Sequence, residues 1–202
     1  MGYNFAKFSF MPSSVKIAQT SHKVLDLIKE RWSPRSYSGT PVTEEEILTI
    51  LEGASWAPSA NNSQPWRYVY ALAGTPGFDK LYSALMPGNQ PWAKNAAALV
   101  LSIGIKELPD LEQKNHYYAH DTGMSNAFLL LQADSMGING HVMAGFHKQQ
   151  IAESLELPAT EEPLVIISLG RRDDAEKLEE PYKSRELAPR TRKPLSEFTK
   201  LV

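Results

Sequence analysis

Residues 57–66 read Ala57-Pro58-Ser59-Ala60-Asn61-Asn62-Ser63-Gln64-Pro65-Trp66 and form the most distinctive stretch of the chain. Two prolines fix where this loop begins and ends, and the side chains between them are mostly short amides and hydroxyls. Such a loop can present several hydrogen-bond donors and acceptors to a heteroaromatic ring or to a sugar chain. Composition alone favours a plainer interpretation, an Asn-rich turn that precedes a strand.

Two basic segments lie outside this loop. Arg31-Trp32-Ser33-Pro34-Arg35 carries two guanidiniums and a hydroxyl, which suit a phosphate or another anion because arginine donates in a planar fork. A solvated helix end explains this segment equally well. Arg190 and Arg192 are two residues apart, so in an extended segment both point the same way and can close on one anion. The alternative there is a solvated basic tail.

The pattern of apolar residues predicts helices alternating with a few buried strands. Thr43 and Glu46 form a capping box that opens a helix. Residues 96–105 are almost continuously apolar, as in a strand that is buried on both faces. Other strands are predicted over 66–72 and 163–169, and other helices over 24–28, 78–86, 117–136 and 147–156.

This alternation indicates a mixed α/β layered domain. We expect a single domain over residues 22–202, because no linker divides the chain, and a loosely structured N-terminal extension over residues 1–21. The tail beyond about Arg171 has little core-forming content of its own. It either packs on the body or reaches across to a partner.

The composition excludes several classes of protein. The chain has 202 residues and no cysteine, which excludes disulfides, thiolate metal sites and iron–sulfur clusters. Its 21 basic and 23 acidic residues give no net field to attract nucleic acid or an anionic membrane. No apolar run approaches the ~20 residues that span a bilayer, and the first residues do not resemble a signal peptide. We therefore expect a soluble, cytoplasmic protein with no nucleic-acid or membrane partner.

Motifs for other chemistries are missing from the sequence. It contains no GxGxxG after a strand, no phosphate-binding GxxxxGK[ST] and no GxSxG nucleophile turn. His116 and His120 lie four residues apart beside Asp121, which is a spacing that metal ligands use. Because neither a third histidine nor the glutamate of HExxH accompanies them, we interpret them as surface histidines and expect no metal.

Taken in order, the three polar motifs resemble the nitroreductase family of flavoproteins. They are Arg-x-Ser-x-Arg at 31–35, Ala-Pro-Ser-x-x-Asn-x-Gln-Pro-Trp at 57–66 and the basic residues near the C-terminus, and residues 121–138 resemble the family's long central helix. The resemblance runs from about Leu25 to the C-terminus. It implies an α+β fold, a three-layer α/β/α sandwich with a central mixed, mainly antiparallel sheet. It also implies an interlocked homodimer with one FMN per chain at the interface.

The resemblance further implies which residues hold FMN. One chain would supply Arg31, Trp32 and Ser33 near the ribityl phosphate, with Arg190 and Arg192 completing a phosphate clamp. Arg35 would lie at the N1 and O2 edge of the flavin ring, and Asn89 on its pyrimidine side. The segment Val142, Met143, Ala144 and Gly145 would present backbone groups to N5 and O4. The partner chain would supply Pro58, Ser59, Ala60 and Asn62.

The implied activity is that of an FMN-dependent oxidoreductase. NADH or NADPH would deliver hydride to flavin N5, and an electrophilic acceptor such as a nitroaromatic or quinone would then take it in a ping-pong cycle. No side-chain acid is needed, and we name no catalytic residue. Some family members carry a glutamate where this chain has Ala144, which leaves the range of acceptors open. Alternatives are a flavin sensor or store without turnover, a relative that acts on a dedicated metabolite, and a structural protein without flavin.

Overall fold

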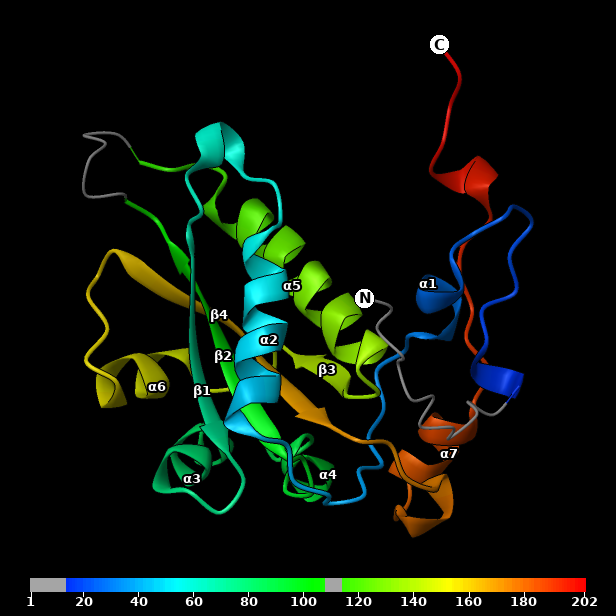
Figure 1. Ribbon diagram of the computed structural model, residues 1–202, viewed down its shortest axis with the longest axis horizontal. Coiled ribbons are helices and arrows are strands. Elements are labelled where there is room, and N and C mark those ends of the chain that lie inside the picture. Colours follow the sequence, from blue (N-terminus) through cyan, green and yellow to red (C-terminus); the bar gives the residue numbers. More distant parts are fainter. Residues whose placement is uncertain (1–13, 108–113) are drawn as a thin grey trace, which may run out of the picture.

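A four-stranded sheet forms the centre of the protein, as the computed structural model shows for residues 14–107 and 114–202 (Figure 1). The strands pair in the order β1-β2-β4-β3, and every described pairing is antiparallel. The prediction of an α+β fold with a mainly antiparallel sheet is therefore confirmed, and the described part of the sheet contains no parallel pair. The strands are β1 (Trp66–Leu72), β2 (Ala98–Ile105), β3 (Asn139–Met143) and β4 (Glu161–Gly170).

Strand β2 shows why the molecule has three layers. All of its residues are buried, as the continuous apolar run predicts. Leu99 and Leu101 belong to one hydrophobic cluster, whereas Ala98 and Val100 belong to another. Because successive side chains of a strand point to opposite faces, the sheet carries a separate core on each face.

Helices α2 (Glu44–Ser55) and α5 (Tyr118–Ser135) pack on each other and cover one face of the sheet (Figure 1). The capping box between Thr43 and Glu46 opens α2, as predicted. Gly53 lets the two helices approach closely, because a Cβ there would lie 2.7 Å from Cγ of Gln132. Their buried side chains, Ile47, Ile50, Ala54, Leu129 and Ala133, form the core on this face.

Shorter helices contribute to the core on the other face, and they place Trp92 and Ile151 in it. They are α3 (Pro76–Ser83), α4 (Gln90–Ala93) and α6 (Lys148–Ser154). Trp92 is buried, and the centre of its ring lies 6.5 Å from that of the buried Tyr37, which belongs to the same cluster. This layer therefore joins the N-terminal part of the chain to the sheet.

The described N-terminal segment 14–30 and the C-terminal segment 182–197 lie side by side beyond the β3 edge of the sheet (Figure 1). This region contains α1 (Asp26–Glu30), α7 (Tyr182–Leu187) and the 3-10 turns Ser14–Lys16, Ala175–Lys177 and Leu195–Glu197. Residues 1–13 of the expected extension lie outside the described residues, but Lys16 is buried against the C-terminal segment. The boundary between extension and domain at residue 21 stays a prediction.

The predicted long elements match the structure to within a few residues at each end. The sequence did not indicate β3, α4 or α7. Strand β3 has five residues and includes Gly140 and His141, which have little intrinsic preference for a strand. Its pairing with β4 therefore stabilises the extended conformation that its own composition does not favour. Within residues 14–107 and 114–202, no helix combines the length and the apolar character that a bilayer crossing requires.

Candidate functional site

A strongly basic pocket lies where the described N-terminal and C-terminal segments meet the edge of the sheet. It has a volume of about 240 Å³ and brings the segment 31–35 together with Arg190 and Arg192, as the resemblance implies. Two thirds of its lining side chains are cations. The full lining is Lys16, Arg31, Trp32, Ser33, Arg35, His141, Arg185, Arg190 and Arg192.

The cations of this pocket are crowded and partly removed from water. Burial lowers the pKa of Arg31, and the neighbouring Arg192 lowers it further. Burial also lowers the pKa of Arg35, with Arg185 adding to the effect. Like charges that are held together in a low-dielectric site favour the binding of an anion, which relieves the repulsion. The pocket therefore suits a ligand with a concentrated negative charge.

Glu186 fixes the segment that carries Arg31 and Arg35. Its side chain is buried, and its Oε1 accepts the backbone N–H of Arg35 at 3.0 Å and that of Ser36 at 3.4 Å. Burial raises the pKa of this carboxyl, while the backbone donors and the charge of Arg35 oppose that rise. The carboxylate is therefore engaged by the protein itself and leaves the arginine side chains to the pocket.

His141 joins the basic pocket to strand β3. Its Nδ1 lies 3.0 Å from the carbonyl oxygen of Pro34, and because a carbonyl only accepts, Nδ1 carries the proton. The imidazole ring also lies 4.5 Å from the ring of Trp92. Burial lowers the pKa of His141 to about 4, with the charge of Arg35 acting in the same direction. His141 is therefore neutral at pH 7 and adds no further charge to the pocket.

The segment that follows His141 contains the backbone groups expected at the flavin. Val142 and Ala144 are exposed, whereas Met143 is buried. Asn89 lies directly beside this segment, because its Nδ2 donates to the carbonyl oxygen of Gly145 at 3.1 Å. The structure thus places Asn89 next to residues 142–145, and His141 connects these residues to the basic pocket.

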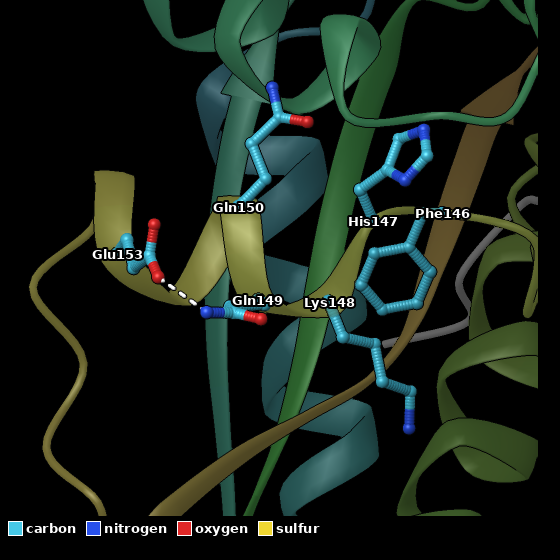
Figure 2. A pocket seen from close by; sticks show the side chains of 6 residues that line it. All are labelled: Phe146, His147, Lys148, Gln149, Gln150 and Glu153. Atoms are coloured by element: carbon cyan, nitrogen blue, oxygen red, sulfur yellow. Dashed lines mark hydrogen bonds between the residues drawn. The ribbon is translucent and has the colours of Figure 1, made fainter.

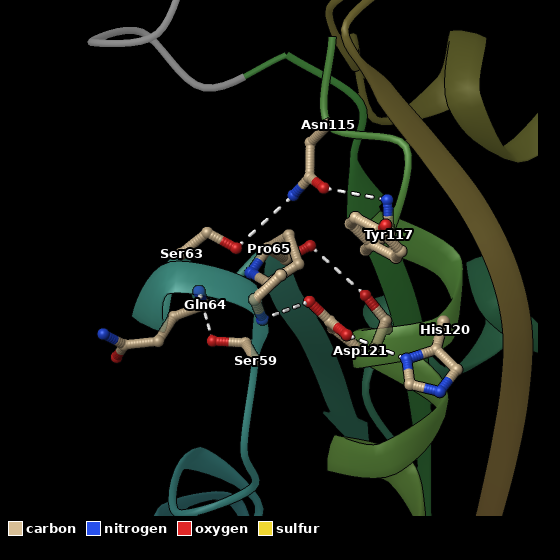
Figure 3. Close-up of polar contacts among 10 residues, drawn as sticks. Ser59, Ser63, Gln64, Pro65, Asn115, Tyr117, His120 and Asp121 are labelled. Carbon is tan, nitrogen blue, oxygen red and sulfur yellow. Dashed lines mark hydrogen bonds and ion pairs between the residues drawn. The ribbon is translucent and has the colours of Figure 1, made fainter.

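Residues 57–66, the Asn-rich loop, are held in place by hydrogen bonds to the beginning of α5 (Figure 3). The buried carboxylate of Asp121 accepts the backbone N–H of Ala60 at 2.9 Å, and the hydroxyl of Thr122 donates to the carbonyl oxygen of Pro65 at 3.2 Å. Asn61 and Asn62 adopt the left-handed backbone conformation, with φ of 52° and 54°. Amide side chains tolerate this conformation better than most residues, which explains the composition of the loop.

Pro58, Ser59, Ala60 and Asn62 do not line the basic pocket of their own chain. The loop bonds to Asp121 in the first turn of α5. Arg31 instead lies near the last turn, where the charge of Asp134 acts to raise the pKa of its guanidinium. Thirteen residues of α-helix separate these two aspartates, which corresponds to about 20 Å. One chain therefore brings the Arg31 segment to Arg190 and Arg192 but leaves the Asn-rich loop apart from them.

Several residues of the site carry no local signal in the sequence. Lys16 lies in a stretch expected to be loose, His141 is an isolated histidine, and Glu186 is one charge in a charged tail. Their positions depend on contacts with residues more than a hundred positions away. Asp121 belongs to the stretch that resembles the family's central helix, but its bond to the loop is not apparent from that resemblance.

Two other places in the molecule have polar side chains close together but offer weaker candidates for a functional site. His120 Nδ1 lies 2.9 Å from Oδ1 of Asp121, and no group of three metal-ligating side chains occurs in the described part of the chain. Figure 2 shows a hollow at the start of α6, where Gln149 donates to Glu153 at 2.8 Å. Its lining residues are Phe146, His147, Lys148, Gln149, Gln150 and Glu153, none of which belongs to the predicted site.

Comparisons with known proteins agree on one family. The family model for the nitroreductase family matches residues 28–75 and 71–171. A solved oxidoreductase that contains FMN is 35% identical, with a TM-score of 0.87 over 90% of this chain and 93% of that chain. A nitroreductase family protein from Clostridium difficile 630 is 28% identical, with a TM-score of 0.66 over 86% of this chain and 95% of that chain. A proposed NAD(P)H nitroreductase from Streptococcus pyogenes is 27% identical over 75% of this chain and 91% of its own length.

Proposed function

This chain belongs to the nitroreductase family, and we propose that it is an FMN-dependent NAD(P)H oxidoreductase that acts as a homodimer. The observation that carries the proposal is the basic pocket, in which Arg31, Arg190 and Arg192 converge. Arginine pairs bind phosphate through charge-assisted and bidentate hydrogen bonds. The pocket is therefore assigned to the phosphate end of FMN.

The residues of the pocket fit a terminal phosphate monoester. Five arginines and one lysine line it, and the buried Glu186 is bonded to backbone N–H groups. A dianion reduces the excess of positive charge that this arrangement leaves. The indole Nε1 of Trp32 is buried without a hydrogen-bond partner in the described structure, so it is a further donor available to the ligand.

Bound FMN would supply the redox chemistry, by taking electrons from NAD(P)H and passing them to an electrophilic acceptor such as a nitroaromatic or quinone in a ping-pong cycle. The chain's own residues bind and orient. Arg35 is proposed at the pyrimidine edge of the flavin, where a fixed guanidinium favours electron uptake. Asn89 and the backbone of residues 142–145 are proposed beside it, and Ala144 contributes no side-chain charge there.

A homodimer completes the site in this proposal. The partner's loop would supply the predicted Pro58, Ser59, Ala60 and Asn62, since the loop of the same chain does not line the pocket. Exposed apolar side chains on and beside the two helices are candidates for burial in such an interface, because Trp56 beside α2 is 78% exposed and Phe128 of α5 is 40% exposed. The C-terminus also projects from the body, with Leu201 fully exposed (Figure 1).

Steady-state kinetics with NADH and with NADPH test the proposed activity. We expect flavin-dependent oxidation of one or both nucleotides, accelerated by a quinone or a nitroaromatic, with parallel double-reciprocal lines. Bound FMN without any turnover contradicts the enzyme and favours a flavin sensor or store. Reduction of the flavin by nucleotide without transfer to any generic acceptor favours a dedicated metabolite as the substrate. Cytoplasmic location stays a prediction from the sequence.

A further inference from the structure

The side chains of Lys16 and Arg190 each donate hydrogen bonds to the backbone of the segment that carries the other. Nζ of Lys16 donates to the carbonyl oxygen of Ala188 at 2.5 Å and to that of Arg185 at 3.4 Å. Nη1 of Arg190 donates to the carbonyl oxygen of Lys16 at 2.9 Å. Each side chain therefore bonds to the backbone of the other segment, which lies more than 160 residues away in the sequence.

Lys16 is fixed more firmly than a surface lysine. The residue is 6% exposed, and its ammonium lies 4.7 Å from the ring centre of Trp32. Buried lysines are rare, and their donors need partners. Here two of the partners are carbonyl oxygens of the C-terminal segment, and burial lowers the pKa of the ammonium. The side chain thus holds one defined part of the chain in place.

That part is the arm 188–192, which carries Arg190 and Arg192 to the basic pocket. The arm lies between α7 and the turn at 195–197, and its residues belong to no described helix or strand. Arg190 also donates to the carbonyl oxygen of Lys29 at 2.7 Å, which ties the arm to the end of α1. Because no strand pairing positions the arm, these side-chain bonds determine where its arginines lie.

We propose that Lys16 is a positioning residue of the phosphate site, which holds the arm 188–192 so that Arg190 and Arg192 face the phosphate monoester of the ligand. The inference rests on the proposed function, because it takes FMN as that ligand. It assigns a role to the N-terminal segment that neither the motifs nor the comparisons give it. Its consequence is specific: Lys16 matters for a flavin with a phosphate and not for one without.

The test compares FMN with riboflavin, which lacks the phosphate. Flavin-stripped full-length wild type, Lys16→Met and Lys23→Met are titrated with each flavin, and binding is followed by quenching of flavin fluorescence. Lys23 is an exposed lysine seven residues further on, so its variant loses the same charge without the contacts. We expect Lys16→Met to reduce the preference for FMN about tenfold or more, with riboflavin affinity and the Lys23→Met variant unchanged.

Limited trypsin cleavage after Arg190 and Arg192 in the flavin-free proteins supplies the second measurement, because a protease cuts a held segment more slowly than a released one. Faster cleavage in Lys16→Met than in wild type and Lys23→Met, together with the lost preference, supports the proposal. A lost preference with unchanged cleavage means that Lys16 acts only as a charge, and this overturns the positioning role. An unchanged preference, or an equal loss for both flavins, also overturns it. If wild type itself does not prefer FMN, the proposed function fails instead.

Lys16→Gln serves the same comparison if Lys16→Met does not yield folded protein. The glutamine amide keeps a hydrogen-bond donor for the arm and lacks the charge. We expect a smaller loss of the FMN preference with a smaller increase in the rate of trypsin cleavage. A glutamine variant that retains both the full preference and the wild-type cleavage rate overturns the role of the ammonium.

Discussion

The carboxylate of Glu186 accepts the backbone N–H of Arg35 through both oxygens, at 3.0 Å and 3.1 Å. This contact joins α7 to the segment that carries Arg31 and Arg35, across about three quarters of the chain. It places a buried carboxylate behind the basic pocket, where it orients backbone rather than guanidinium groups. The stability of the protein should therefore respond to the charge of Glu186.

Replacing Glu186 with Gln should make the protein less sensitive to rising pH. Burial raises the pKa of Glu186, so between its unfolded and folded pKa values the folded protein holds a proton that the unfolded chain has lost. The contribution of this group to stability is therefore present below the unfolded pKa and lost as pH rises through the folded pKa. Glutamine keeps the acceptor oxygen and does not ionise.

Denaturant unfolding of both flavin-stripped proteins from pH 4 to pH 7 checks this expectation. As pH rises above 4.5, the ordinary pKa of a glutamate side chain, the free energy of unfolding of wild type should fall relative to that of Glu186→Gln. A difference that stays constant, or that moves in favour of wild type, contradicts the assigned direction of the shift.

Arg190 and Arg192 should differ when each is replaced by alanine. Arg190 bonds to the carbonyl oxygens of Lys16 and Lys29, whereas the described contact of Arg192 is to its neighbour Thr191. Arg190→Ala should lower both FMN affinity and the free energy of unfolding, the latter by about 1–2 kcal/mol. Arg192→Ala should lower FMN affinity while stability changes by less than about 0.5 kcal/mol. Flavin titration and urea unfolding of the flavin-free variants measure the two effects, and equal destabilisation by both would rule out the difference.

Asp121 should be important for the stability of the Asn-rich loop. Asp121→Ala removes the acceptor of the Ala60 N–H at a buried position, and we expect a loss of about 1.5–3 kcal/mol in the free energy of unfolding. Asp121→Asn keeps an acceptor oxygen and should lose less. Denaturant unfolding of the three proteins checks the order. Alanine and asparagine variants of equal stability would show that the bond to Ala60 contributes little.

The shared site should be visible in mixed dimers. One chain carries Arg31→Glu and the other carries Ser59→Trp with Asn62→Asp, and each is inactive alone. If each site takes the Arg31 side from one chain and the loop from the other, one of the two sites in a mixed dimer is intact. Random assortment makes about half of the dimers mixed, so co-expression should restore about a quarter of wild-type activity.

Differently tagged chains allow the mixed dimer to be isolated and its flavin to be counted. One FMN per mixed dimer supports a site shared between chains. A verified, folded heterodimer without activity or flavin shows that each site takes both its Arg31 side and its loop from the same chain, which contradicts a shared site.

Local signals predicted much of the fold. The capping box at Thr43 and Glu46 fixed the start of α2, and the apolar run predicted β2, because both depend on neighbouring residues. Strand β3 was missed because its pairing with β4 is non-local. The same limit applies to the site. The arginines at 31–35 and 190–192 were recognised through family resemblance, whereas Lys16 and Glu186 act through contacts that span more than 150 residues.

The flavin carried by the purified protein reports directly on the ligand of the basic pocket. Its absorption spectrum should show flavin bands, and chromatography of the flavin released by heat should identify FMN. The pocket of Arg31, Arg190 and Arg192 predicts a terminal monophosphate. Release of FAD contradicts that assignment of the pocket. A colourless protein that takes up no FMN on titration contradicts the proposed function as a whole.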